Sequence, residues 1–140
     1  MSAPTPWMVA RGTPGYPGCL EELGSRAPAA LYCLGNRGLL AELDSERAVT
    51  IVGSRRSGAY GCGVARELAF GAAGAGLVVV SGMALGCDSA AHEGALDARG
   101  PTIAVLGGGP DVPYPPSKTG LYRRILARGG AVVSEQPPGT

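Results

Sequence analysis

Aromatic residues, lysine and net charge are all scarce in this chain of 140 residues. Aromatics make up 5% of the sequence, Lys118 is the only lysine, and the formal net charge is +1. A protein that coats nucleic acid through a generally basic surface is therefore excluded, and any binding of phosphate must depend on a local patch. The few aromatic rings also limit how many bases could stack on the protein.

Long apolar runs and metal-binding patterns are missing as well. No apolar run approaches the roughly 20 residues that span a bilayer, and residues 1–13 lack the pattern of a signal peptide. The cysteines form no C-x-x-C pair and do not cluster with the single histidine, so we expect free thiols in a reducing cytosol. They are Cys19, Cys33, Cys62 and Cys87. These absences predict a soluble, cytoplasmic protein with no membrane partner, metal or cofactor.

Glycine and hydrophobic residues are abundant instead. The chain has 24 glycines without a fixed period, and 45% of its residues are hydrophobic. This composition indicates one compact folded domain with many tight turns. Residues 1–47 are expected to form an N-terminal arm and lead-in, and residues 48–140 the core. The lead-in is predicted as an irregular arm over 1–18, a short helix over 19–23, a strand over 29–34 and helical turns over 37–43.

From residue 48 onward, short apolar strands alternate with helical patterns. Strands are predicted over 48–53, 77–82, 101–109 and 131–135, and helices over 60–75, 87–99 and 117–128. In the first helix, apolar residues recur at helical spacing at Val64, Leu68 and Ala72. This alternation is typical of βαβ units, and near-continuous apolar strands indicate a parallel sheet covered on both faces. The sequence therefore predicts an α/β, doubly wound, Rossmann-like fold with a mostly parallel sheet.

Three successive predicted strands end in glycine-rich loops, and such loops meet at one edge of a parallel sheet. Glycine lets backbone N–H groups approach an anion, and the first two loops lead into helix N-termini, which attract phosphate. Arg55 and Arg56 add guanidinium donors. Any one of these loops alone is equally well explained as an ordinary turn, but together they predict an anion site. The loops are Gly53-Ser54-Arg55-Arg56, Ser81 to Gly86, and Gly107-Gly108-Gly109.

The sequence does not favour a nucleotide-dependent enzyme. No G-x-G-x-x-G follows the first core strand, Ser81 and Gly82 stand where an acidic ribose anchor is expected, and no Walker A sequence is present. Ser81, Asp88 and His92 include a nucleophile and a base, but no G-x-S-x-G elbow supports catalysis. We expect Asp88 to cap the following helix, and His92 to bond to a neighbouring strand end or a ligand. No catalytic residue is predicted.

The stiff loop GGGPDVPYPP carries Tyr114 near its tip. Prolines at 110, 113, 115 and 116 restrict its backbone strongly. Two roles for the Tyr114 ring stay open at this point. The ring either stacks on a base or packs beneath the loop.

Four ordered motifs resemble those of the DNA processing protein A (DprA/Smf) family. They are IVGSRRSGAYG, VVVSGMALGCDSAAHEGAL, TIAVLGGGPDVPYPP and VVSEQPPGT, and the match covers residues 48–140. The upstream YPGCLEEL and ALYCLGN are similar to the family's lead-in. The resemblance implies a single-stranded DNA-binding protein on an extended Rossmann fold that protects incoming DNA in natural transformation and helps to load the RecA recombinase. It further implies a homodimer without known catalytic activity.

The matching motifs indicate which residues of this chain correspond to the family's phosphate-binding pocket. By resemblance, Gly53, Ser54 and Arg55 line the pocket, with Ser81, Gly82, Gly86 and Asp88 beside them, and Gly107, Gly109 and Asp111 as the other wall. Together with the residues chosen on physical grounds, the predicted site comprises Gly53, Ser54, Arg55, Arg56, Ser81, Gly82, Gly86, Asp88, His92, Gly107, Gly108, Gly109, Asp111 and Tyr114. Two departures are Leu85, where many relatives carry Lys or Arg, and Cys87, where Ile is usual.

Relatives in this family continue past PPGT, so we expect this chain to be a truncated protein or a fragment with weakened DNA affinity. Two other functions stay open. A phosphoribohydrolase of Rossmann type shares the phosphate loops, but its PGGxGTxxE motif is absent here. A carrier of a small nucleotide or pterin would use the same crevice and would not distinguish a polymer from a mononucleotide.

Overall fold

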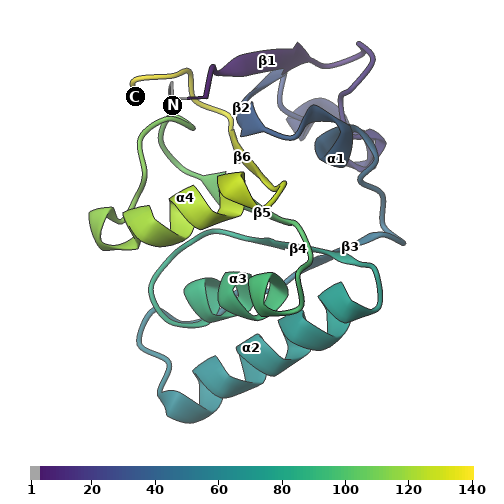
Figure 1. Ribbon diagram of the computed structural model, residues 1–140. Coiled ribbons are helices and arrows are strands. Elements are labelled where there is room, and N and C mark those ends of the chain that lie inside the picture. Colours follow the sequence, from purple (N-terminus) through teal and green to yellow (C-terminus); the bar gives the residue numbers. More distant parts are fainter. Residues whose placement is uncertain (1–3) are drawn as a thin grey trace.

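The computed structural model describes residues 4–140, which form a six-stranded mixed sheet flanked by helices (Figure 1). The strand order is β1-β2-β6-β5-β4-β3. Strands β3 to β6 are parallel to one another. Strand β2 pairs antiparallel with β6, and β1 pairs antiparallel with β2. The strands are β1 (Trp7–Ala10), β2 (Ala30–Gly35), β3 (Ala48–Thr50), β4 (Val78–Ser81), β5 (Thr102–Leu106) and β6 (Ala131–Ser134).

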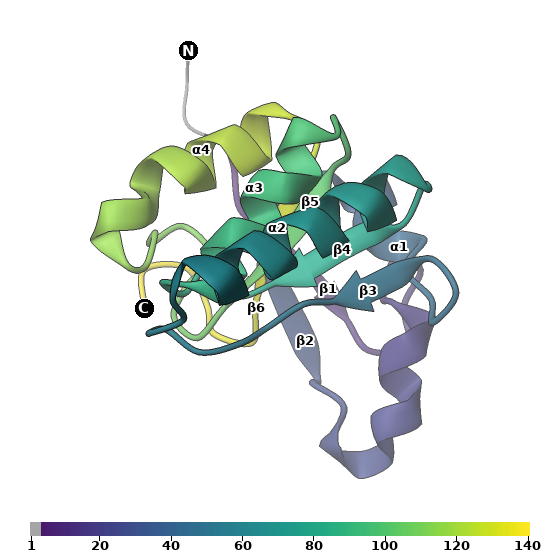
Figure 2. The same ribbon diagram turned by 90° about the horizontal axis from the view of Figure 1, so that it is seen from below.

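Helices cover both faces of this sheet unequally. The crossover helices α2 (Ala59–Gly74), α3 (Cys87–Asp97) and α4 (Thr119–Ala127) lie on one face (Figures 1 and 2). Because β3 to β6 are neighbours in chain order, right-handed crossovers place all three helices on the same side. The short α1 (Arg37–Ala41) and the 3-10 segment η1 (Gly18–Arg26) pack on the other face. The predicted Rossmann-like α/β fold is confirmed.

The prediction of an irregular arm over residues 1–18 is wrong in part. Residues 1–3 lie outside the described residues, but Trp7–Ala10 forms β1, an edge strand paired with β2. Trp7 anchors this strand, since its indole N–H donates to the carbonyl of Gly35 at 3.2 Å and its ring stacks against the guanidinium of Arg37. The strand predicted over 29–34 and the helical turns over 37–43 are present as β2 and α1.

Small residues form the interface between α2 and α3. Ala69, Ala91 and Ala95 are fully buried there, whereas Leu68 on the outer side of α2 is 60% exposed. At Gly94 the helices approach so closely that an added Cβ would overlap the carbonyl oxygen of Arg66. At the other end of the interface, Sγ of Cys87, the first residue of α3, lies 4.0 Å from the carbonyl oxygen of Gly61 in the first turn of α2. No helix within residues 4–140 is long and apolar enough to span a bilayer.

Candidate nucleic-acid interface

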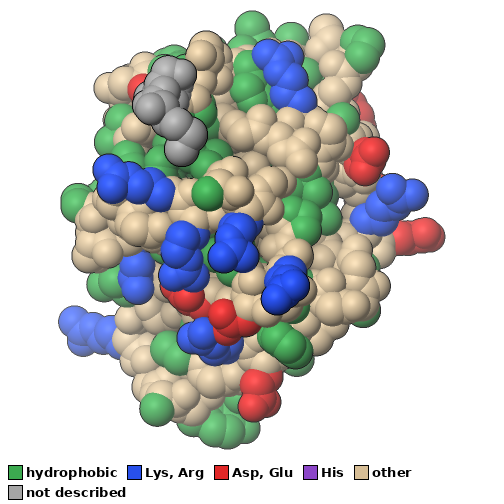
Figure 3. All heavy atoms as spheres, viewed as in Figure 1, with side chains coloured by type: hydrophobic (Ala, Val, Ile, Leu, Met, Phe, Trp, Pro, Cys, Tyr) green, Lys and Arg blue, Asp and Glu red, His purple; other side chains and the backbone are tan. Residues whose placement is uncertain are grey.

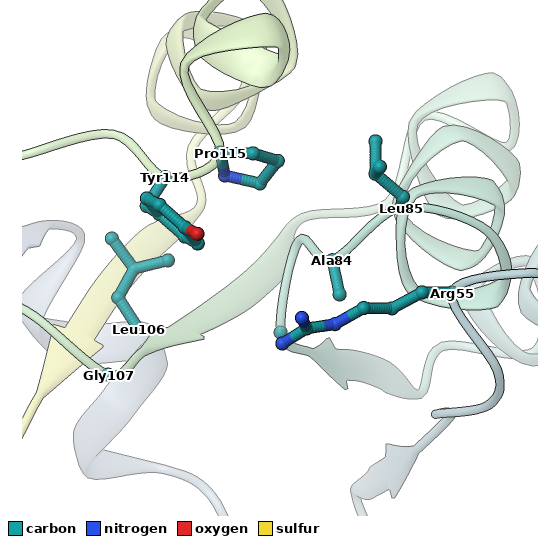
Figure 4. Close-up of a pocket in the computed structure, with 8 residues that line it drawn as sticks. Arg55, Ala84, Leu85, Leu106, Gly107, Tyr114 and Pro115 are labelled. Carbon is teal, nitrogen blue, oxygen red and sulfur yellow. The ribbon is translucent and has the colours of Figure 1, made fainter.

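The three predicted loops converge at the carboxyl ends of β3, β4 and β5, where they enclose a pocket of about 270 Å³. Its walls come from the β3–α2 loop, the β4–α3 loop and the loop that follows β5. Tyr114 and Pro115 form one side of the pocket above Leu106, and Arg55 extends across the other side beneath Ala84 (Figure 4). The lining residues are Arg55, Gly82, Ala84, Leu85, Leu106, Gly107, Tyr114 and Pro115.

Arg55 supplies the positive charge of this pocket. Within residues 4–140, neither Arg55 nor Arg56 forms an ion pair, although Arg11, Arg66 and Arg124 each do. Other basic side chains lie elsewhere: Figure 3 shows Lys and Arg gathered across the middle of the face that carries α3 and α4, with Asp and Glu beside them. An unpaired guanidinium can bind phosphate oxygens in a bidentate manner. Arg56 is exposed and does not line the pocket.

Backbone and serine contacts hold the β3–α2 loop that carries Arg55. The hydroxyl of Ser54 accepts a hydrogen bond from the N–H of Arg56 at 3.0 Å, and its carbonyl accepts one from the Ser57 hydroxyl at 2.9 Å. Gly86 has a φ of +81°, and an added Cβ there would overlap the Ser54 carbonyl oxygen. Glycine is therefore required at 86 both for its backbone conformation and for the close contact between the two loops.

Asp88 lies in the first turn of α3 and bonds back to the β4–α3 loop. The prediction that it caps this helix is wrong, because the N-cap residue is Gly86 and no side chain within the described part of the chain caps the helix. Asp88 is 6% exposed, and its Oδ2 accepts a hydrogen bond from the N–H of Gly82 at 3.2 Å. That N–H is consequently occupied. Ser81 is also engaged, since its hydroxyl donates to the carbonyl of Ile51 at 2.6 Å. Met83 is fully buried with a φ of 60°, an uncommon conformation for a residue with a side chain.

The third loop is secured by the end of β6 and the residues that follow it. The hydroxyl of Ser134 donates to the carbonyl of Gly108 at 2.6 Å, and Oδ1 of Asp111 accepts from the N–H of Gly139 at 2.8 Å. An added Cβ at Gly109 would lie 2.7 Å from the carbonyl oxygen of Pro137. Gly108, Gly109 and Asp111 thus join the PPGT segment to the pocket wall.

His92 lies in the core between α3 and the sheet, away from the residues that line the pocket. It is fully buried, and its Nδ1 is 2.9 Å from the hydroxyl oxygen of Thr102. Burial lowers the pKa of this imidazole to about 4. Ser81, Asp88 and His92 each have a separate hydrogen-bond partner, so these three side chains form no nucleophile–base pair. The expectation that His92 bonds to a neighbouring strand is confirmed, because Thr102 begins β5.

The predicted residues divide into those that line the pocket and those that support its loops. Arg55, Gly82, Gly107 and Tyr114 line it, and the Tyr114 ring is 64% exposed, so it does not pack beneath its loop. The supporting or remote residues are Gly53, Ser54, Arg56, Ser81, Gly86, Asp88, His92, Gly108, Gly109 and Asp111. Site prediction missed four lining residues: Ala84, Leu85, Leu106 and Pro115.

Across residues 4–140, no three His, Cys, Asp or Glu side chains come together in a way that could hold an ion. The pocket brings together one positive charge, an exposed aromatic ring and tightly turned backbone.

Comparison with known proteins gives a consistent answer. The sequence model of the family described as DNA recombination-mediator protein A matches residues 7–140. A DprA homologue of Mycobacterium tuberculosis is 47% identical over 115 residues, which make up 81% of this chain and 28% of the relative. Protein Smf of Synechocystis is 36% identical over 135 residues, which make up 96% of this chain and 33% of the relative. The chain thus spans about a third of the length of these relatives.

Solved structures agree with the sequence comparison. The X-ray structure of DNA processing protein A from Streptococcus pneumoniae superposes with a TM-score of 0.81 at 36% identity, covering 95% of this chain and 44% of that one. A structure of DNA processing protein A from Helicobacter pylori, described for its single-stranded DNA binding mode, gives a TM-score of 0.77 at 30% identity and covers 96% and 57% of the two chains. The chain belongs to the DNA recombination-mediator protein A family, also called DprA/Smf.

Proposed function

We propose that this chain binds single-stranded DNA at the pocket between the β3–α2, β4–α3 and post-β5 loops, without performing chemistry on it. The observation that carries the proposal is the unpaired guanidinium of Arg55, which extends across a pocket whose opposite wall is the exposed ring of Tyr114. A phosphate needs the first group, and an unstacked base can use the second. A duplex offers no unstacked base to such a ring.

The mixed lining of the pocket fits a nucleotide unit better than a free phosphate ion. The apolar part of the wall comes from Leu85, Leu106 and Pro115, whereas Arg55 is the single charged lining residue. Base planes bind through stacking and apolar contact, which tolerates any sequence. We therefore infer one phosphate contact and one base contact per pocket, with little sequence preference.

Within the longer proteins of the family, this pocket would form part of a larger DNA-binding surface. We propose that the complete protein protects incoming DNA during natural transformation and assists loading of RecA, as a homodimer in the cytoplasm. Support for this comes from the family membership of the chain and from the Helicobacter pylori relative that is described as binding single-stranded DNA.

Fluorescence anisotropy of a labelled oligo-dT titrated with the protein tests the proposed site. Arg55→Ala should weaken binding roughly tenfold, the typical value of a charge-assisted hydrogen bond to phosphate, and Tyr114→Ala should weaken it by a similar factor. Arg56→Ala is the matched control: the same residue type, adjacent and exposed, but outside the pocket. Equal losses for Arg55→Ala and Arg56→Ala would contradict the assignment. Competition by a mononucleotide as strong as that of the oligonucleotide would favour a small-molecule carrier.

A further inference from the structure

Two thiols meet at one hydroxyl group directly behind the Arg55 loop. The Cys87 Sγ–H donates to Oγ of Ser57 at 3.2 Å, and Sγ of Cys62 lies 3.5 Å from the same oxygen. Cys62 lies in the first turn of α2, and Cys87 is the first residue of α3. Both thiols are partly exposed, so a small solute can reach them.

The remaining two cysteines lie apart from this pair, in β2 and η1. Cys33 is fully buried in β2, and burial raises the pKa of its thiol to about 12, which keeps it protonated and unreactive. Cys19 lies in η1 on the other face of the sheet, and burial raises its pKa as well. The chain therefore contains one pair of neighbouring accessible thiols and two isolated thiols that serve as internal controls.

We propose that Cys62 and Cys87 form a disulfide when the folded protein meets a hydroperoxide, and that this bond loosens the Arg55 loop. One thiol attacks the peroxide, breaks its O–O bond and becomes a sulfenic acid as one water leaves. The second thiol attacks that sulfur, the disulfide forms, and the sulfenic oxygen leaves as a second water. Two thiols and one hydrogen peroxide thus give one disulfide and two waters, and the sulfurs lose the two electrons that the peroxide gains.

The loosening follows from the place of the Ser57 hydroxyl. That hydroxyl contacts both sulfurs and donates to the carbonyl of Ser54, a bond that closes the turn containing Arg55. The disulfide has no S–H left to donate to this hydroxyl, and the two sulfurs must shift past it to reach bonding distance. We therefore expect the bond from the Ser57 hydroxyl to Ser54 to weaken. Cys87 also packs closely against the backbone of this loop, since an added Cβ at Gly53 would lie 2.6 Å from its Sγ.

Peptide mapping of the protein treated with hydrogen peroxide tests the disulfide. The expected result is an intact mass lower by two hydrogens and one linked peptide pair containing Cys62 and Cys87, with Cys33 still a free thiol. Either Cys62→Ser or Cys87→Ser should abolish the link, and Cys19→Ser should leave it unchanged. Sulfinic acids on separate cysteines, or a link that involves Cys19, would overturn the proposal.

Hydrogen exchange without any DNA tests the effect on the loop. The amides of residues 54–57 should exchange faster in the oxidised protein, return to their original rates with dithiothreitol, and show no response to peroxide in Cys62→Ser. Unchanged exchange in a protein with the disulfide mapped would overturn the loosening.

The effect on DNA rests on the proposed function and has its own readout. Oligo-dT should bind several-fold more weakly to the oxidised form, and reduction should restore binding. Equal binding by both forms would show that the Arg55 loop is not the DNA contact, even with the disulfide and faster exchange established. Absence of binding by the reduced form would count against the proposed function alone, because mapping and exchange are measured without DNA.

Discussion

Acid should destabilise this protein in part through one buried side chain, His92, which is the only histidine of the chain. The hydroxyl of Thr102 donates to the carbonyl of Val79 at 2.6 Å, so it accepts from the imidazole, whose Nδ1 carries the proton. Among the described residues, Nε2 of His92 has no hydrogen-bond partner. A second proton would therefore place a charge in a buried site, where a contact with the Ser81 backbone offsets only part of the desolvation cost.

The size and sign of the effect follow from the pKa difference between the two states. Burial lowers the pKa of His92 from 6.5 to about 4. At about 1.4 kcal/mol per pKa unit, this difference corresponds to about 3 kcal/mol. Below pH 6.5 the unfolded chain binds a proton that the folded chain does not bind, so the free energy of unfolding falls as the pH falls from 6.5 to about 4 and His92 contributes no further change below that.

Urea unfolding at a series of pH values measures this loss. Protonation of carboxylates also destabilises the folded protein in acid. Glu21 is one of them, because its pKa is lowered mainly by its hydrogen bond to Arg11. The contribution of His92 is therefore isolated by comparing the protein with a variant that lacks the imidazole. His92→Gln keeps a donor near Thr102 and cannot titrate, and its stability should fall less between pH 6.5 and 4. The ring pKa can also be read directly by NMR in the unmodified protein. A measured pKa near 6.5, or equal pH profiles for the two proteins, would refute the reasoning.

Two further pairs of variants and one single variant test the packing and the loops by urea unfolding. Gly94→Ala should cost at least 1–3 kcal/mol, because its methyl group overlaps backbone of α2, whereas Gly71→Ala, with nothing within 4 Å, should stabilise by about 0.5–1 kcal/mol. Asp88→Ala should cost about 1–3 kcal/mol by removing the acceptor of the partly buried Gly82 N–H, and Asp97→Ala, which removes an exposed ion pair, less than about 1 kcal/mol. Tyr122→Phe should cost about 1 kcal/mol through its lost bond to the loop after β5, and a neutral result would refute that role.

The regular part of the fold was predictable because it depends on local patterns. Four apolar strands that alternate with segments of helical periodicity are compatible with few arrangements other than a parallel α/β sheet. The edge strand β1 was missed because its four residues lie between stretches rich in proline and glycine, and its pairing with β2 depends on residues far along the chain. The buried face of α2 was also hard to identify. Large apolar residues such as Leu68 face outward, since only alanines fit the close approach to α3.

At the site, the convergence of the loops was predictable and the roles of single residues were not. Glycine-rich turns after successive parallel strands must meet at one edge, which placed Arg55, Gly82 and Gly107 together. The sequence does not show that Asp111 bonds to Gly139, because that contact spans the loop after β5 and the end of the chain. Leu85 lies in the same glycine-rich loop as Gly82 and is exposed. A large apolar residue within that loop was the sequence feature that could have predicted an apolar pocket wall.

Amide NMR spectra of the labelled protein, recorded during titration with oligo-dT, test the central claim most directly. The account predicts salt-sensitive shifts confined to the amides of the Arg55, Gly82–Leu85 and Gly107–Tyr114 segments, with α1 and β1 unaffected. It also predicts that these shifts require roughly tenfold more oligo-dT in Arg55→Ala and are unchanged in Arg56→Ala. Shifts centred on α1, β1 or the outer side of α2, or no shifts at low salt from the folded protein, would contradict it.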